Sequence, residues 1–355
     1  MKLLKKLCLT IGIILGVLLL AAAGLFLFLV ITEYRPEPVE KLEVLGSECS
    51  ILDKTTFSVL SWNVGYCALG EESDFFMDGG LQIRPETEDW VTKNYNGIRD
   101  LITGQDADFL LLHEVDSDST RSYGLNQAAG LRAEGERESA YALNYSCKFV
   151  PFPWPPIGKV NSGLLTTSRC AVTEASRISL PCPFSWPVSI ANLKRCLLVT
   201  RIPLKGTEKE LVLVNLHLEA YDDGEGKAAQ SEQLRAFLSE EYAKGNYVLA
   251  GGDWNQTFPD AGSAWPNTHG ELWSPGALDA SELDADWRYV CDGSLPTCRL
   301  LNQPYDPSDT EGTQYFVIDG FLVSPNLIVE QVETLDGGFS CSDHNPVRLT
   351  LTLGD

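Results

Sequence analysis

The sequence lacks several features that identify common classes of protein. It contains no repeat period and no low-complexity tract, which argues against a repeat protein and against a disordered chain. No Cys-x-x-Cys pair occurs among its ten cysteines, so a structural zinc site is not indicated. With 44% hydrophobic and 10% aromatic residues, the composition is instead that of a globular protein with a core.

Positive charge is also scarce. The chain has 27 lysines and arginines against 49 aspartates and glutamates, and residues 36–355 carry 23 against 48. This negative charge disfavours a long polyanion held through its backbone, because that affinity comes from Lys and Arg. No basic stripe interleaved with aromatic residues is present either. A small phosphate site is not excluded, because a bound divalent metal inverts the local charge.

The N-terminus contains the one long apolar run. Lys2, Lys5 and Lys6 precede 26 uncharged residues, 7–32, whereas a membrane-spanning helix needs about 20. A cleaved signal peptide is the alternative, but its apolar region is usually about 7–15 residues long. Because the basic residues precede the run, the N-terminus should stay in the cytoplasm. The sequence therefore predicts a single-pass cell-membrane protein with an extracytoplasmic domain.

The cysteines leave the disulfide pattern open. Cys8 lies in the apolar run, which leaves nine others, and an odd number cannot all pair within one chain. Two pairs are close enough in sequence to form small loops: Cys291 with Cys298, and Cys182 with Cys196. The sequence does not determine which pairs form, nor the oligomeric state.

Beyond the apolar run, short strand-like segments alternate with a few helical ones. We divide the chain into an anchor over 1–32, a linker over 33–55 and one domain over 56–355. Amphipathic spacing predicts helices over 91–103 and 228–244. Apolar runs rich in β-branched and aromatic residues predict strands over 57–63, 108–114, 162–167, 196–200, 211–218, 247–250, 315–318 and 346–353. This interleaving predicts one α/β domain built on large sheets.

Three stretches have the composition of surface insertions. Residues 66–90 are acidic, 149–158 combine prolines with aromatic residues, and 258–286 contain Trp, Pro and Gly. Long irregular loops in a compact domain are usually functional or mobile. Phe152 and Trp154 in the second stretch could touch a bilayer, because aromatic side chains favour the membrane interface. The alternative is a proline-stiffened loop packed on its own domain.

Polar residues recur at the ends of the predicted strands, where ligands of α/β proteins bind. Each has a structural alternative: a turn residue, a surface carboxylate, a strand cap or, for His217, a hydrogen-bonded core histidine. His113 should face the other side of its strand from Glu114, and we expect it to be structural. The residues that would converge on one pocket are Asn63, Glu114, Asp116, His217, Asp253, Asn255, Asp319, Asp343 and His344.

The ordered set resembles the endonuclease/exonuclease/phosphatase superfamily, which includes pancreatic-type deoxyribonuclease, abasic-site endonucleases, neutral sphingomyelinases and inositol polyphosphate 5-phosphatases. The family usually has Gln where this chain has His113. The segments that carry the resemblance are Leu60-Ser-Trp-Asn63, Leu112-His-Glu-Val-Asp116, Ser162-Gly-Leu-Leu, Asn215-Leu-His-Leu218, Gly252-Asp-Trp-Asn255, Ile318-Asp-Gly-Phe321 and Ser342-Asp-His-Asn-Pro346.

The resemblance implies an α/β four-layered sandwich of two packed mixed β-sheets flanked by helices. It also implies roles. Glu114 would bind the divalent metal, with Asn63 and Asp343 close to it. Asp253 would orient or deprotonate the attacking water. Asn255 and His217 would hold phosphoryl oxygens, and His344, oriented by Asp319, would act as acid/base or electrostatic stabiliser.

Physical chemistry supports the same assignment. Phosphoester hydrolysis needs neutralised phosphoryl oxygens, a positioned water and a stabilised leaving oxygen. Mg²⁺, with Mn²⁺ as the alternative, prefers one or two carboxylates plus water and phosphate, which Glu114 and Asp343 could supply. Four further residues near the predicted strand ends are candidates for substrate binding: Arg121, Tyr123, Lys159 and Asn161.

The substrate remains a choice among alternatives. The predicted anchor favours a phosphodiesterase of sphingomyelinase type, or one with another phospholipid substrate, that recognises a lipid headgroup. An endonuclease is the second hypothesis, and the net negative charge of residues 36–355 disfavours it. An inositol phosphatase is less favoured, because the Trp-Cys-Asp-Arg-type segment is missing. A catalytically inactive binding module is a further alternative, although Glu114, Asp253 and His344 are all present.

Overall fold

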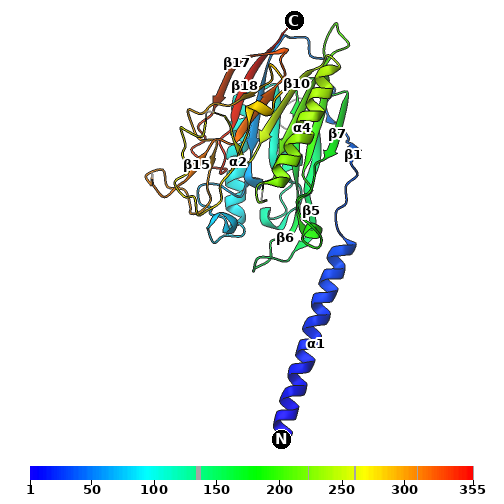
Figure 1. Ribbon diagram of the computed structural model, residues 1–355, viewed down its shortest axis with the longest axis vertical. Coiled ribbons are helices and arrows are strands. Elements are labelled where there is room, and N and C mark those ends of the chain that lie inside the picture. Colours follow the sequence, from blue (N-terminus) through cyan, green and yellow to red (C-terminus); the bar gives the residue numbers. More distant parts are fainter. Residues whose placement is uncertain (133–136, 223, 260, 310, 355) are drawn as a thin grey trace.

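The computed structural model of the chain contains two seven-stranded sheets packed face to face, with helices on the outer faces and one helix projecting from the domain (Figure 1). It describes residues 1–132, 137–222, 224–259, 261–309 and 311–354. Residue 260 of the third predicted insertion therefore lies outside the described residues, as does 355.

Both sheets are mixed, with β3–β4 and β9–β10 as the parallel pairs of the seven-stranded sheets. The first sheet has the order β1 (Val39–Lys41), β7 (Glu174–Ser179), β8 (Cys196–Pro203), β9 (Glu210–His217), β10 (Tyr247–Asp253), β16 (Asp319–Val323) and β13 (Arg288–Val290). The second has the order β17 (Leu327–Thr334), β18 (Val347–Leu353), β3 (Thr56–Asn63), β4 (Phe109–Asp116), β6 (Gly158–Ser168), β5 (Glu138–Val150) and β2 (Leu45–Gly46). Two small sheets pair β11 (Gln256–Thr257) with β12 (Gly276–Ala277) and β14 (Cys298–Arg299) with β15 (Tyr315–Phe316).

The central strands are apolar on both faces because both faces are covered. In β3, Phe57 and Val59 belong to the core between the two sheets. Leu60 and Trp62 belong instead to the outer core that includes Ile98. This explains why the strands appear in the sequence as continuous apolar runs rather than as alternating ones.

Two long helices cover the outer faces. Helix α2 (Glu88–Gln105) packs its buried side chains on the second sheet, and its N-cap Thr87 accepts a hydrogen bond from the Trp90 N–H at 3.4 Å. Helix α4 (Glu225–Ala243) packs on the first sheet. A short helix, α3 (Gln127–Arg132), and five 3₁₀ turns complete the domain: η1 (Gly65–Cys67), η2 (Phe76–Asp78), η3 (Thr120–Ser122), η4 (Val188–Ala191) and η5 (Ala280–Glu282). The predicted four-layered α/β architecture is therefore confirmed.

The N-terminal helix α1 (Lys2–Ile31) is long and apolar enough to cross a membrane, and none of its residues is buried. Its last turns touch the domain, where Phe26 lies edge-on to Trp186 with ring centroids 5.8 Å apart. Residues 33–55, expected as a linker, contain β1 and β2, which pair with β7 and β5. The chain after α1 is therefore held on the edges of both sheets.

Several sequence predictions need correction. The strand expected over 315–318 is divided: β15 belongs to a small sheet, and β16 begins only at Asp319. Strand β5 was not predicted, because inward and outward residues alternate along it without a continuous apolar run. The sequence left the disulfide pattern open, and no disulfide joins two cysteines in the part of the chain that the structure describes.

Candidate active site

The predicted polar residues converge where neighbouring strands of the two sheets end. Asn63 ends β3, Glu114 lies near the end of β4, and His217 and Asp253 end β9 and β10. Because β9 and β10 are parallel, His217 lies directly opposite Asp253. Asp319 begins the antiparallel β16 and lies opposite Asp253 on its other side. Asp319 therefore joins the cluster from a strand start, although the sequence suggested a strand end.

Asp253 is the centre of the cluster. Its Oδ2 accepts a hydrogen bond from Nδ2 of Asn63 at 3.0 Å and lies 3.4 Å from Nε2 of His217. Its Oδ1 accepts the backbone N–H of Asn255 at 2.9 Å. Burial, together with the negative charge of Asp319, raises the pKa of Asp253 to about 6. A carboxylate with this pKa can accept a proton from water near neutral pH.

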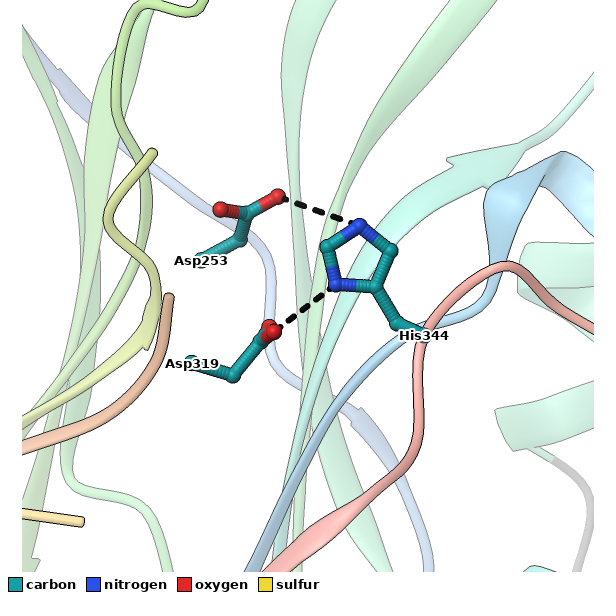
Figure 2. A group of neighbouring side chains, drawn as sticks. All are labelled: Asp253, Asp319 and His344. Carbon is teal, nitrogen blue, oxygen red and sulfur yellow. Dashed lines mark hydrogen bonds and ion pairs between the residues drawn. The ribbon is translucent and has the colours of Figure 1, made fainter. Parts of the chain in front are cut away.

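A buried histidine and aspartate form the second part of the cluster (Figure 2). Nδ1 of His344 lies 2.8 Å from Oδ2 of Asp319, and Nε2 lies 3.8 Å from Oδ2 of Asp253. Burial disfavours the charged imidazole, but the surrounding negative charges, Asp319 first, outweigh it and raise the pKa of His344 well above its ordinary value. The positively charged form of the His344 imidazole is therefore favoured in this position.

The second histidine of the cluster has the opposite charge preference. Only 5% of His217 is exposed, and burial lowers its pKa well below the ordinary value, so the ring is neutral. Arg195 fixes the end of the strand by donating to the His217 backbone carbonyl at 3.3 Å. His113 packs behind it, fully buried, with ring centroids 6.4 Å apart. The pKa values of the two histidines are therefore shifted in opposite directions.

Two carboxylates beside this cluster are suited to a divalent cation. Glu114 has a left-handed backbone (φ 54°) at an irregularity in the β4–β6 pairing, and its Oε1 lies 3.4 Å from Nδ2 of Asn63. Burial raises the pKa of Glu114, and it raises that of Asp343 to about 7. Among the described residues, no lysine or arginine forms an ion pair with either carboxylate. A hard cation such as Mg²⁺ or Mn²⁺ would supply the missing positive charge.

Asp253, Asp319 and His344 form a second group whose spacing would allow a metal ion to bind. The ligand atoms of Asp253, Asp319 and His344 lie within 4.8 Å of one another. The hydrogen bond between His344 and Asp319 would compete with an ion at that position. Imidazole nitrogen in its charged form also has no lone pair for a metal. The hydrogen bond between His344 and Asp319 therefore argues against an ion at that position.

The cluster lies in a cavity, and two other predicted residues, Asn255 and Arg121, also line it. The side-chain amide of Asn255 donates to the Leu218 carbonyl at 2.9 Å, which fixes its orientation. The guanidinium of Arg121 lies 3.5 Å from the centroid of the Tyr66 ring and pairs with Asp116 at 3.1 Å. Arg121 is thus a cation held in place at the wall of the cavity, as expected for a phosphate-binding residue.

The other three candidates for substrate binding are not among the described residues that line the cavity. The hydroxyl of Tyr123 donates to the Pro85 carbonyl at 3.0 Å. Lys159 pairs with Asp118, and the side-chain amide of Asn161 donates to the backbone carbonyl of the same Asp118 at 3.3 Å. The structure therefore does not bring them to the cluster, and their roles stay predictions.

The sequence did not single out several polar residues of the cavity, which has a volume of about 530 Å³. Arg195 lies 3.5 Å from Glu219, and both are buried. Asp78 and Tyr221, hydrogen-bonded at 2.8 Å, come from two loops far apart in sequence. Of these residues, only Glu219 could have been predicted from the sequence, because it is a second polar residue just after an apolar strand, two positions beyond His217. The others reach the cavity through tertiary folding.

Comparison with known proteins agrees with this geometry. The chain matches the sequence model of the Endonuclease/Exonuclease/phosphatase family over residues 60–344. No curated protein sequence matches it. Three solved structures have a similar fold; the values in parentheses are the sequence identity, the covered share of this chain, the covered share of the other chain, and the TM-score. They are an endonuclease/exonuclease/phosphatase from Beutenbergia cavernae (19%, 85%, 72%, 0.56), one from Bacteroides vulgatus (17%, 84%, 100%, 0.55) and ANGEL2, a 2',3'-cyclic phosphatase (15%, 88%, 99%, 0.54).

Proposed function

Because the chain belongs to the endonuclease/exonuclease/phosphatase family, we propose that it is a membrane-anchored, divalent-metal-dependent phosphodiesterase whose substrate is a phospholipid. The catalytic domain would lie on the extracytoplasmic side. One observation carries the lipid assignment: the cavity that contains the catalytic cluster is also lined by apolar residues of an exposed ridge beside the end of α1.

The cluster contains the groups that a phosphodiester hydrolase needs. Asp253 would accept a proton from the attacking water, while Asn63 and His217 hold the carboxylate in place. The imidazolium of His344, oriented by Asp319, would stabilise negative charge on the phosphoryl oxygens. A cation bound by Glu114 and Asp343 would supply Lewis-acid stabilisation of the phosphate and the leaving oxygen.

The exposed ridge consists of Phe152, Trp154, Trp186 and Val188. These residues are 72%, 87%, 67% and 59% exposed, and such exposed apolar surface often marks an interaction site. Phe152 and Val188 also line the cavity. Aromatic side chains favour the interface between membrane and water, so the ridge is suited to touch a bilayer.

The position of α1 supports the same arrangement. Phe26 in its last turns contacts Trp186 of the ridge, and Leu29 packs against the small cluster that contains Val150 and Val160 of the β5–β6 hairpin. The hairpin lies at the end of the domain from which α1 projects (Figure 1). If α1 spans the bilayer, the ridge comes to its surface and the cavity opens toward lipid headgroups.

The catalytic residues lie toward the same end of the sheet. In the β4–β6 pairing, Asp116 lies opposite Ser162, and the β5–β6 turn begins just beyond, where Val150 pairs with Gly158. A lipid phosphate at the surface would therefore have only a short distance to travel to Glu114. Nucleic acid is the less favoured substrate, since the domain carries a large excess of acidic residues.

The proposal is tested with the full-length chain in detergent micelles containing Mg²⁺, beside an Asp253→Ala control. The substrates are sphingomyelin, phosphatidylcholine, bis-p-nitrophenyl phosphate, p-nitrophenyl phosphate and plasmid DNA. We expect turnover of a phospholipid and of the soluble diester by the wild-type chain, and none by the control.

Three outcomes would contradict the proposal at different levels. Nicking of DNA without turnover of any lipid would make the protein an anchored nuclease. Turnover of the monoester alone would make it a phosphomonoesterase. No metal-dependent difference from Asp253→Ala on any substrate would remove the enzymatic assignment itself.

A further inference from the structure

Another part of the cavity lining combines aromatic rings with a buried carboxylate. We call it the headgroup lobe and define it by Phe76, Asp78, Tyr221 and Trp273. Phe76 and Asp78 come from the predicted insertion 66–90, and Trp273 comes from the predicted insertion 258–286. Both insertions therefore meet at one wall of the cavity, beside the loop that follows β9.

The carboxylate of the lobe is held without a cationic partner. Oδ1 of Asp78 accepts the Tyr221 hydroxyl at 2.8 Å, and Oδ2 lies 3.4 Å from the Leu301 backbone nitrogen, which donates to it. Among the described residues, no lysine or arginine forms an ion pair with Asp78, although only 7% of its surface is exposed. A buried carboxylate without a countercharge is a favourable neighbour for a bound cation.

The rings of the lobe are held in fixed orientations. The Trp273 indole donates to the Ala220 carbonyl at 2.9 Å and lies edge-on to Phe316 with ring centroids 5.7 Å apart. The Tyr221 ring, 36% exposed, is tilted by 56° against the indole at 6.1 Å. Rings held in this way offer faces to a ligand without losing side-chain freedom when it binds.

Positive charge near this wall is not available to an anionic headgroup. Arg299 also lines the cavity, but its Nη2 donates to the carbonyls of Gly70 and Ser73 at 2.8 and 3.1 Å. Arg195 lines the cavity as well, but its guanidinium is paired with the carboxylate of Glu219. The headgroup lobe therefore combines aromatic rings with a carboxylate that has no lysine or arginine ion pair among the described residues. Burial raises the pKa of Asp78, and a cation bound beside it would offset that cost of ionisation.

We propose that the headgroup lobe binds the quaternary ammonium group of a choline phosphodiester, while the apolar ridge side of the cavity receives the lipid alcohol. This inference rests on the proposed phospholipid substrate and specifies its headgroup. Quaternary ammonium ions bind within about 6 Å of aromatic ring centroids, where the ring quadrupole attracts them, and they need no hydrogen-bond acceptor. Asp78 supplies the countercharge, and Tyr221 holds it in place.

The test compares three ceramide phosphodiesters that differ only in the headgroup, which is choline, ethanolamine or glycerol. Full-length wild type, Trp273→Leu, Trp273→Phe and Asp78→Asn are assayed with Mg²⁺ in the same detergent micelles. We expect wild type to have the highest kcat/KM for the choline lipid. Trp273→Leu and Asp78→Asn should lower the choline-to-glycerol ratio of kcat/KM by about 3- to 10-fold, as expected for a lost cation–π contact or countercharge.

Two variants separate recognition from general damage. Trp273→Phe keeps an aromatic face and should retain most of the preference for choline. Trp90→Leu removes a tryptophan of α2 that does not line the cavity, and it should leave the ratio at the wild-type value. An unchanged ratio in both Trp273→Leu and Asp78→Asn would overturn the headgroup assignment.

The failure of this inference can be distinguished from failure of the proposed function. Equal kcat/KM for the three lipids would remove the choline site and leave the lipid phosphodiesterase intact. If no lipid is hydrolysed, phosphocholine and inorganic phosphate are compared by isothermal titration calorimetry on the Mg²⁺-loaded protein. Binding of phosphocholine that is no tighter than that of phosphate would then overturn the site, and tighter binding that Trp273→Leu abolishes would support it.

Discussion

Nδ1 of His344 lies 2.8 Å from Oδ2 of Asp319, and the two residues come from a loop and a strand start that are far apart in sequence. The second oxygen of Asp319 is buried without a hydrogen-bond partner. The backbone N–H of Asp319 donates to Thr297 Oγ1 at 3.1 Å, which holds the strand start in place. The carboxylate is therefore positioned mainly to orient the imidazole and to stabilise its positive charge.

Replacement of this carboxylate should reduce catalysis without unfolding the protein. Asp319→Asn keeps the shape of the side chain but removes the charge that raises the pKa of His344. We expect kcat for bis-p-nitrophenyl phosphate to fall by roughly 10²- to 10⁴-fold. The thermal midpoint, followed by circular dichroism, checks that the fold is retained. A kcat within a factor of about two of wild type would show that the pair is not used in catalysis.

Removal of metal should abolish activity reversibly. The part-buried Glu114 and the buried Asp343 lack a lysine or arginine ion pair among the described residues, so a divalent cation would supply the countercharge. EDTA should remove turnover, and Mg²⁺ or Mn²⁺ should restore it. Glu114→Gln should shift the Mg²⁺ concentration at half-maximal activity upward by at least about tenfold, which corresponds to about 1.4 kcal/mol.

A matched variant makes the metal prediction specific. Glu271→Gln removes a carboxylate that lies outside the cavity lining and should leave the Mg²⁺ titration unchanged. Full activity of the wild type in EDTA, after dialysis against the chelator, would contradict the assignment of Glu114 and Asp343.

The exposed ridge should affect lipid substrates more than soluble ones. Trp154 is 87% exposed, so Trp154→Ser removes little internal packing. We expect its rate on phospholipid vesicles to fall about fivefold relative to its rate on bis-p-nitrophenyl phosphate, because about 1 kcal/mol of apolar burial in the bilayer is lost. Ile328→Ser, an exposed apolar residue of β17, is the control. Equal effects on both substrates, or an equal effect in the control, would count against a bilayer contact.

A pH-dependent contribution to stability should come from a pair remote from the site. Burial opposes ionisation of Glu241, but hydrogen bonds from Arg201, then Lys244, hold its pKa at about 2. Because the folded-state pKa lies below the ordinary 4.5, the unfolded state binds more protons between these values. The stabilisation is therefore present above about pH 4.5 and is lost as the pH falls toward 2.

Glu241→Gln should accordingly lower the free energy of unfolding by about 2 kcal/mol at pH 7, as expected for hydrogen bonds to a charged group. The difference from wild type should be smaller at pH 3, because the wild-type carboxyl is then partly protonated. Thermal unfolding at both pH values measures the effect, with the exposed neighbour in Glu240→Gln as control. A difference that grows toward low pH would contradict this sign.

The motifs of the sequence, through their resemblance to a known family, were enough to predict the two-sheet architecture, and the strand ends predicted most of the polar residues that lie together in the structure. Strands buried on both faces must be apolar along their whole length, so polar residues at their ends, such as Asn63, His217 and Asp253, stand out against that background. The amphipathic helices were detectable for the same reason, since each packs one face on a sheet. The long apolar N-terminal segment was likewise recognisable from its length alone.

The arrangement and the charges of these residues could not be predicted without the three-dimensional structure. Strand β5 and the edge strand β17 carry alternating polar residues, and their pairing is set by neighbours distant in the chain. The pKa values of His217 and His344 shift in opposite directions because their charged neighbours differ, Arg195 for His217 and Asp319 for His344, although both residues are only 5% exposed. The approach of Asp78 to Tyr221 likewise depends on where two loops fold, because no local pattern links residues so far apart in the chain.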